Sequence, residues 1–214
     1  MVTRQQVVEA LRLEDFDVWS AQRQMIPDPR PRTRPPERAG NPREGAVLLL
    51  LYCDQGELSL VLTRRPDTLK DHAGQISLPG GRQDMGESLG ETALRETCEE
   101  VGICDGHIQL LGQLTTIYIP PTDFHVHPFV GWYEGRPAFR LNPLEVAELI
   151  PVALLQLRHP DIRRQEMWTL RGMEIEVPFF QVGEHKVWGA TAIILAEFLG
   201  RLEQVTGDDL FLAE

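Results

Sequence analysis

Residues 78–103, LPGGRQDMGESLGETALRETCEEVGI, constrain the fold more than any other part of the chain. A Pro-Gly-Gly turn opens this segment. Ser88 and Glu91 then have the spacing of a helix capping box, and Gly102 suits the end of a helix. We therefore expect a helix of about four turns, which begins just after a tight turn.

The expected helix has two chemically different faces. Glu96, Glu99 and Glu100 share one face at i, i+3 and i+4, and small or apolar residues on the other side can pack on a sheet. At about 4 Å and an effective dielectric constant near 20, each pair of carboxylates costs on the order of 4 kcal/mol. A solvated helix face is the ordinary explanation of such a cluster, but a hard cation such as Mg²⁺ also offsets the repulsion. The glycine turn favours the cation, because its backbone can approach a metal or a phosphate.

The rest of the chain predicts a mixed sheet flanked by helices. Residues 45–53 and 58–65 are apolar runs joined by a short glycine turn, which indicates a hairpin. A strand-to-helix change is expected in 143–157 and a helix in 188–205. Further strands are expected in 107–119, 124–133, 167–172 and 173–180.

The N-terminal part differs in composition from the rest. We expect a short amphipathic helix in its first residues, exposed enough to permit a dimer contact. A Pro- and Arg-rich connector follows at 25–43 and should run extended over the surface. The predicted organisation is residues 1–44 as helix and linker, 45–206 as one catalytic domain, and 207–214 as a tail.

Composition excludes several classes of protein. The net charge of −11 argues against nucleic-acid binding, which needs a basic surface. No apolar run approaches the roughly 20 residues of a membrane span. Three cysteines are too few for a disulfide framework, so we expect a cytoplasmic protein, either a monomer or a homodimer.

The glutamate-rich segment resembles the Nudix box, G-x5-E-x7-R-E-U-x-E-E-x-G-U, where U is aliphatic. Eight specified positions match, and Thr97 replaces one aliphatic residue. The matches are Gly81, Glu87, Arg95, Glu96, Glu99, Glu100, Gly102 and Ile103. The resemblance implies an α/β fold, the Nudix α/β/α sandwich with a mixed β-sheet, and metal-dependent hydrolysis of a nucleoside diphosphate linked to another group.

The resemblance also implies roles for the residues of the box. Glu96, Glu99 and Glu100 would bind Mg²⁺ or Mn²⁺, and Arg95 would hold these carboxylates in position. Glu87 would either join the metal shell or brace the loop. The general base would be Glu99 or, from a distal loop, Glu145; Glu148 resembles the same acidic residues of that loop.

The segment before the box, VLTRRPDTLKDHAGQISLPGG at 61–81, resembles the additional motif of coenzyme A pyrophosphatases. The matching residues are Thr63, Arg65, Gly74, Pro79, Gly80 and Gly81, and the departures are Val61, Pro66, Lys70 and Leu78. The implied substrate is coenzyme A or acyl-coenzyme A, cleaved to 4′-phosphopantetheine or its acyl form and adenosine 3′,5′-bisphosphate. The substrate-binding candidates are Arg64, Arg65, Lys70, Gly80 and Gly81, with His72 beside them. Lys70 keeps the charge of the expected arginine but not its planar fork.

Other interpretations stay open at this point. A Nudix hydrolase of ADP-ribose, NADH or a dinucleotide polyphosphate has the same box, and a non-catalytic module would bind nucleotides without cleaving them. His125 and His127 alternate along a strand and can face a cleft, although a structural role is commoner. Several aromatic residues can stack on adenine, but core packing is the commoner role: Trp132, Tyr133, Phe179, Phe180 and Trp188.

Overall fold

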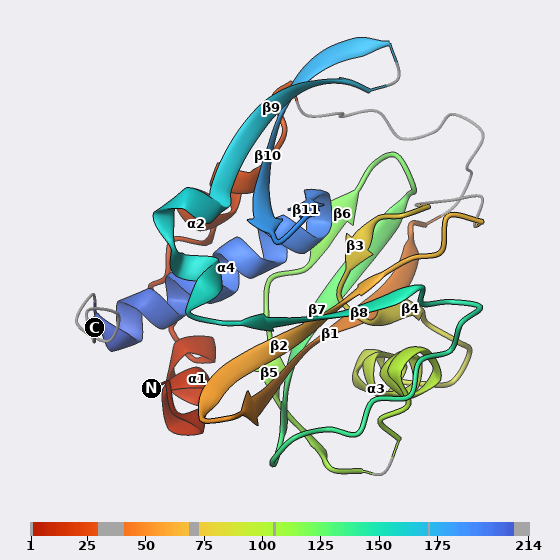
Figure 1. The fold of residues 1–214 in the computed structure, drawn as a ribbon, viewed down its shortest axis with the longest axis vertical. Helices are drawn as coiled ribbons and strands as arrows, with labels where there is room; N and C mark the ends of the chain where they lie inside the picture. The colour runs from red at the N-terminus through yellow and green to blue at the C-terminus, as the bar shows by residue number, and fades with distance from the viewer. Residues whose placement is uncertain (1, 30–40, 69–72, 105, 171, 208–214) are drawn as a thin grey trace.

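The computed structural model describes residues 2–29, 41–68, 73–104, 106–170 and 172–207 (Figure 1). The helices of this part are α1 (Arg4–Leu11), α2 (Val18–Gln22), α3 (Leu89–Val101) and α4 (Gly189–Thr206). The strands are β1 (Arg43–Asp54), β2 (Glu57–Arg64), β3 (Ile76–Ser77), β4 (Gly80–Arg82), β5 (Ile108–Gln113), β6 (Ile117–Ile119), β7 (Phe124–Tyr133), β8 (Glu148–Ala153), β9 (Arg163–Leu170), β10 (Met173–Val182) and β11 (His185–Trp188).

Strand β1 is the centre of a mixed sheet of eight strands. It pairs in parallel with β7 and antiparallel with both β2 and β4. The order is β3-β2-β1-β7-β5, with β4 on β1, β6 on β7 and β8 on β2. The predicted hairpin and the mixed sheet are therefore confirmed, and the almost unbroken apolar run of β1 suits a strand that is buried on both faces.

Helices cover both faces of this sheet (Figure 1). Leu48 and Leu50 of β1 belong to the same apolar cluster as Ala93 of α3. Leu49 and Leu51 point to the opposite face, where the apolar cluster includes residues of α4 and α1. The α/β/α arrangement expected from the sequence is thus confirmed.

The N-terminal helix is not the exposed element that the sequence suggested. Helix α1 packs against α4, and its Val7 and Ala10 are fully buried in the cluster that α4 shares with the sheet. The expectation of an exposed helix is wrong because its apolar stripe completes that core.

Most of the predicted linker lies outside the described residues, as does nearly all of the tail. The domain limits therefore stay predictions, although β1 itself begins at Arg43.

The C-terminal part adds a small antiparallel sheet in the order β11-β10-β9. The strands expected in 167–172 and 173–180 are confirmed as β9 and β10, which are longer than predicted. The strand-to-helix change expected in 143–157 is half confirmed: β8 forms, but it is followed by two short 3₁₀ helices, at Gln156–Arg158 and Pro160–Ile162, and not by an α-helix. No helix in the described part of the chain is long and apolar enough to cross a membrane.

One disulfide joins Cys98, in the last turn of α3, to Cys104 just beyond the helix, and Cys53 is free. This bond was not expected, because three cysteines are too few for a disulfide framework and none of them forms a C-x-x-C pair. The bond encloses the end of the glutamate-rich helix.

Candidate active site and metal centre

Two glycines of β4 allow α3 to lie close against the sheet. Gly80 has φ of 155°, and a Cβ on it would lie 2.3 Å from the backbone oxygen of Ala46. A Cβ on Gly81 would lie 2.5 Å from the carboxyl carbon of Glu96. Only glycine therefore permits both the turn and the approach of the Glu96 carboxylate to β4.

Both ends of α3 have the caps that the sequence predicts. The Ser88 hydroxyl accepts from the Glu91 N–H at 3.3 Å, and the Glu91 carboxylate accepts from the Ser88 N–H at 2.7 Å. Gly102 takes the left-handed conformation with φ of 77°, and its N–H donates to the Cys98 carbonyl. The capping box and the glycine stop are confirmed, and they fix where the carboxylates of the helix emerge.

Arg95 ties three carboxylates together. Its guanidinium donates to both oxygens of Glu87 at 2.8 and 3.0 Å, to Glu96 at 2.9 Å and to Glu99 at 3.3 Å. It also donates to the backbone oxygen of Arg82 in β4. A planar fork suits such multiple contacts, and the surrounding carboxylates, Glu87 foremost, raise the pKa of Arg95.

Glu87 has the contacts of a loop brace. Besides Arg95, it accepts from the backbone N–H of Asp84 and the hydroxyl of Thr92, both at 2.8 Å. These hydrogen bonds, led by that of Arg95, lower its pKa to about 2. Of the two roles that the resemblance left open, the geometry favours the brace.

Glu100 is a buried carboxylate of the helix, and Glu96 is partly buried, with its side chain 15% exposed. Glu100 is only 4% exposed, and burial raises its pKa to about 8 despite the nearby charge of Arg65 and the Gly80 N–H. Burial also raises the pKa of Glu96. Glu99 differs from both, because its side chain is 48% exposed and contacts Arg95.

Glu145 lies within electrostatic range of Glu96 and Glu100, since its charge contributes to the raised pKa of both. Its loop is attached to α3 through the Asn142 N–H, which donates to the Glu100 carbonyl oxygen at 3.0 Å. The structure thus brings Glu145 to the helix that it was predicted to serve. Glu148 lies at the start of β8, where it accepts from His185 at 3.1 Å.

These residues have the chemistry that a divalent cation needs. Oε2 of Glu100 is buried and has no hydrogen-bond partner among the described residues, which is costly for a carboxylate oxygen without a cation. No group of three or more His, Cys, Asp or Glu in those residues forms a complete set of metal ligands. Mg²⁺ does not require one, because it keeps waters and binds through one or two carboxylates and the substrate phosphates. Glu96 and Glu100 can supply those carboxylates.

The basic residues of the upstream motif differ in their surroundings. Arg65 lies near enough to Glu100 to act on its pKa, and its Nε is buried without a hydrogen-bond partner in the described residues. Arg64 is paired with both oxygens of Asp67 at 2.7 Å. An exposed pair of this kind is weak enough for a phosphate to replace it. Lys70 and His72 lie outside the described residues.

The two strand histidines are bridged by one carboxylate. Glu44 contacts Nδ1 of His125 at 3.0 Å and Nε2 of His127 at 2.6 Å. This direct contact indicates the structural role. Phe179 and Phe180 are fully buried, so core packing is confirmed for both.

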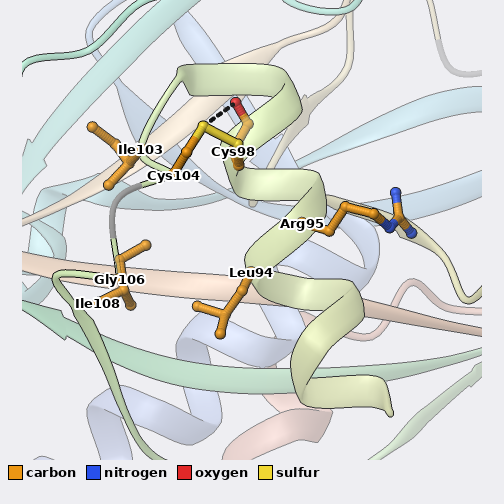
Figure 2. Close-up of a pocket in the computed structure, with 7 residues that line it drawn as sticks. All are labelled: Leu94, Arg95, Cys98, Ile103, Cys104, Gly106 and Ile108. Carbon is orange, nitrogen blue, oxygen red and sulfur yellow. Dashed lines mark hydrogen bonds between the residues drawn. A yellow bond between two sulfur atoms is a disulfide. The ribbon is translucent and has the colours of Figure 1, made fainter. Parts of the chain in front are cut away.

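A small pocket of about 240 Å³ lies beside the disulfide, between α3 and the start of β5. Figure 2 shows Leu94 and Cys98 at this pocket, with the Arg95 guanidinium pointing away from them. The predicted ligands and the predicted base do not line it. Arg95 lines the pocket and contacts Glu96 and Glu99, so the pocket adjoins the carboxylate face without including its predicted ligands.

Comparison with known proteins agrees with this geometry. A family model described as NUDIX domain matches residues 42–169. A protein of Photorhabdus laumondii, "Uncharacterized Nudix hydrolase NudL", is 36% identical over 171 residues, which are 79% of this chain and 90% of the relative. The protein of the same name from Pectobacterium atrosepticum is 36% identical over 197 residues, covering 87% and 92%.

Solved structures show the same fold. The crystal structure of the MutT protein from Methanosarcina mazei superposes with a TM-score of 0.51 at 21% identity, covering 78% of this chain and 97% of that one. A MutT/nudix family protein from Enterococcus faecalis also gives 0.51, at 16% identity, over 97% and 81%. By its sequence and by its fold, this chain belongs to the Nudix hydrolase family, whose members cleave derivatives of nucleoside diphosphates.

Proposed function

We propose that the protein is a coenzyme A diphosphatase, which cleaves coenzyme A or acyl-coenzyme A to 4′-phosphopantetheine or its acyl form and adenosine 3′,5′-bisphosphate. The upstream motif is what favours this substrate over other nucleotides. Its Arg65 supports the proposal most, because this arginine lies beside Glu100 with a buried Nε that lacks a hydrogen-bond partner in the described residues. A diphosphate oxygen is a suitable acceptor for that group.

The proposed roles follow from burial and charge. Glu96 and Glu100 hold the cation, Mg²⁺ or Mn²⁺, and the exposed Glu99 completes the set or serves as an alternative base. When bound, the cation neutralises charge on the diphosphate and makes a water more acidic. Arg95 orients Glu96 and Glu99, and it keeps Glu87 ionised in its brace.

The remaining roles belong to the substrate and the attacking water. Arg65, together with Arg64 and Lys70, binds phosphate oxygens, while Gly80 and Gly81 let the backbone approach the diphosphate. Glu145 accepts a proton from the attacking water, since its loop is attached to α3 by the hydrogen bond between the Asn142 N–H and the Glu100 carbonyl oxygen.

A substrate panel tests this proposal directly. The purified protein is incubated with Mg²⁺ and either coenzyme A, acetyl-coenzyme A, ADP-ribose, NADH or diadenosine polyphosphates, and the products are separated. We expect coenzyme A or its acyl form to have the highest kcat/KM, with the two named products in equal amounts. Faster cleavage of ADP-ribose or NADH would contradict the proposed substrate, and binding without any cleavage would indicate a regulatory module.

We also propose that the enzyme acts in the cytoplasm on this small-molecule substrate, as a monomer or a homodimer. The acidic composition and the small number of cysteines support this location. A reducing cytoplasm disfavours disulfides, so this location predicts that the Cys98–Cys104 bond is reduced in the cell. Alkylation of the native protein in cell extracts, followed by mass spectrometry, shows whether the bond is present there.

A further inference from the structure

The turn that carries Glu145 is closed by a single residue, Asn142. The sequence Asn142-Pro143-Leu144-Glu145 has asparagine and proline at the positions that type I turns prefer. The N–H groups of Glu145 and Val146 donate to the Asn142 carbonyl oxygen at 3.0 and 2.8 Å. The Asn142 side chain adds a third contact, because its Oδ1 accepts from the Leu144 N–H at 3.1 Å.

This turn is attached to the catalytic helix on one side and to the main sheet on the other. The N–H groups of Arg140 and Asn142 donate to the carbonyl oxygens of Val101 and Glu100, at 2.9 and 3.0 Å. These bonds satisfy carbonyl groups at the end of α3 that have no partner within the helix. At the other end, the Ala147 N–H donates to the carbonyl oxygen at the end of β2.

Close packing at the helix end reinforces the attachment. A Cβ on Gly102 would lie 2.7 Å from the Arg140 carbonyl oxygen, so the loop lies directly on the helix cap. The backbone around Asn142 is consequently fixed relative to α3. The orientation of Glu145 then depends on the conformation of the turn, which the Asn142 side chain closes.

We propose that Asn142 is a positioning residue for hydrolysis: its side-chain oxygen holds the turn that presents Glu145 to the attacking water. This inference rests on the proposed function in one respect, which is the role of Glu145 as base. In this proposal Asn142 acts indirectly. It acts through the Leu144 N–H and through its own carbonyl oxygen, to which the Glu145 N–H donates.

Three single variants separate this role from a general contribution to folding. Asn142→Ala removes Oδ1, Asn142→Asp keeps an acceptor at that position, and Leu144→Ala changes an exposed side chain of the same turn but keeps its N–H. We measure kcat and KM with whichever nucleotide the protein cleaves best. In Asn142→Ala we expect kcat to fall between about 10-fold and 100-fold with KM within about twofold of the wild type, because misplacement of a catalytic group lowers kcat. Asn142→Asp should recover most of the loss, and Leu144→Ala should behave as the wild type.

A double variant gives the decisive comparison. If Asn142 acts only through Glu145, Asn142→Ala combined with Glu145→Gln should be no slower than Glu145→Gln alone. Losses that multiply, a change confined to KM, or no recovery in Asn142→Asp would overturn the proposal. Full activity of Glu145→Gln would overturn it as well.

The failure of this inference differs from the failure of the proposed function. Cleavage of another nucleotide in place of coenzyme A removes the proposed substrate, but the same kcat ratios still test Asn142. Hydrogen exchange of the metal-free protein tests the turn itself, whichever nucleotide the protein cleaves. The amides of Leu144, Glu145 and Val146 should exchange faster in Asn142→Ala and return to wild-type rates in Asn142→Asp, and equal rates in all three proteins would overturn the proposal.

Discussion

Glu100→Gln should make the metal-free protein less sensitive to pH. The pKa of Glu100 is raised from an ordinary value of 4.5 to about 8, so between these values the folded state binds more protons than the unfolded state. Stability from this group is therefore complete below the lower value and is lost as the pH rises towards the higher one. Between these two pKa values, each rise of one pH unit lowers the unfolding free energy by about 1.4 kcal/mol. Between about pH 5 and about pH 7.5, the wild type should lose up to about 3 kcal/mol more than the variant.

The comparison across pH isolates the charge of Glu100. Glutamine keeps an oxygen that can accept from the Gly80 N–H. Its amide group, however, takes the buried position where Oε2 has no partner in the described residues, and this lowers the unfolding free energy by about 1–3 kcal/mol. This cost is the same at both pH values and cancels in the difference. The assay is urea unfolding with a chelator present, and Glu99→Gln serves as the control, because its side chain is 48% exposed. Parallel pH profiles of the wild type and Glu100→Gln would refute the burial argument.

Four further perturbations test other parts of the structure. Arg95→Lys should lower kcat by roughly tenfold, since an ammonium group cannot hold both oxygens of Glu87 while it contacts Glu96. Steady-state kinetics measures this effect, and an unchanged kcat would contradict it. Gly81→Ala should weaken Mn²⁺ binding in calorimetry with little change in Tm, because its Cβ meets the movable end of Glu96. Gly80→Ala should lower Tm instead, because its Cβ meets the backbone of β1; equal effects of the two variants on Tm would argue against this geometry. Reduction of the Cys98–Cys104 bond should cost about 2 kcal/mol and lower Tm by about 5 °C, whereas an unchanged Tm would show that the bond is absent in solution.

The parts of the fold that follow local rules could be predicted from the sequence. The hairpin, the strand at 124–133 and the caps of α3 depend on apolar runs, glycine turns and a capping box, and all of them are present in the structure. Helix α1 could not be placed in this way. Its burial depends on α4, which lies nearly 200 residues later in the chain, and a short amphipathic pattern does not say what covers it.

The site shows the same division between local and distant contacts. The shared face of Glu96, Glu99 and Glu100 follows from helical spacing. Their different environments do not, because burial of Glu100 and exposure of Glu99 depend on β4 and on the loop of Glu145. A signal for Asn142 was present in the sequence, since Asn-Pro begins a turn, but what the turn is attached to is visible only in the fold.

The proposed hydrolysis depends on a divalent cation that Glu96 and Glu100 of α3 hold and that binds the diphosphate. Crystals soaked in Mn²⁺ test it most directly, through anomalous difference density measured at the manganese edge. We expect a peak between Glu96 and Glu100 in the wild type and a weaker peak or none in Glu100→Gln. A wild-type crystal with no peak at these carboxylates, at a Mn²⁺ concentration that supports hydrolysis in solution, would contradict it.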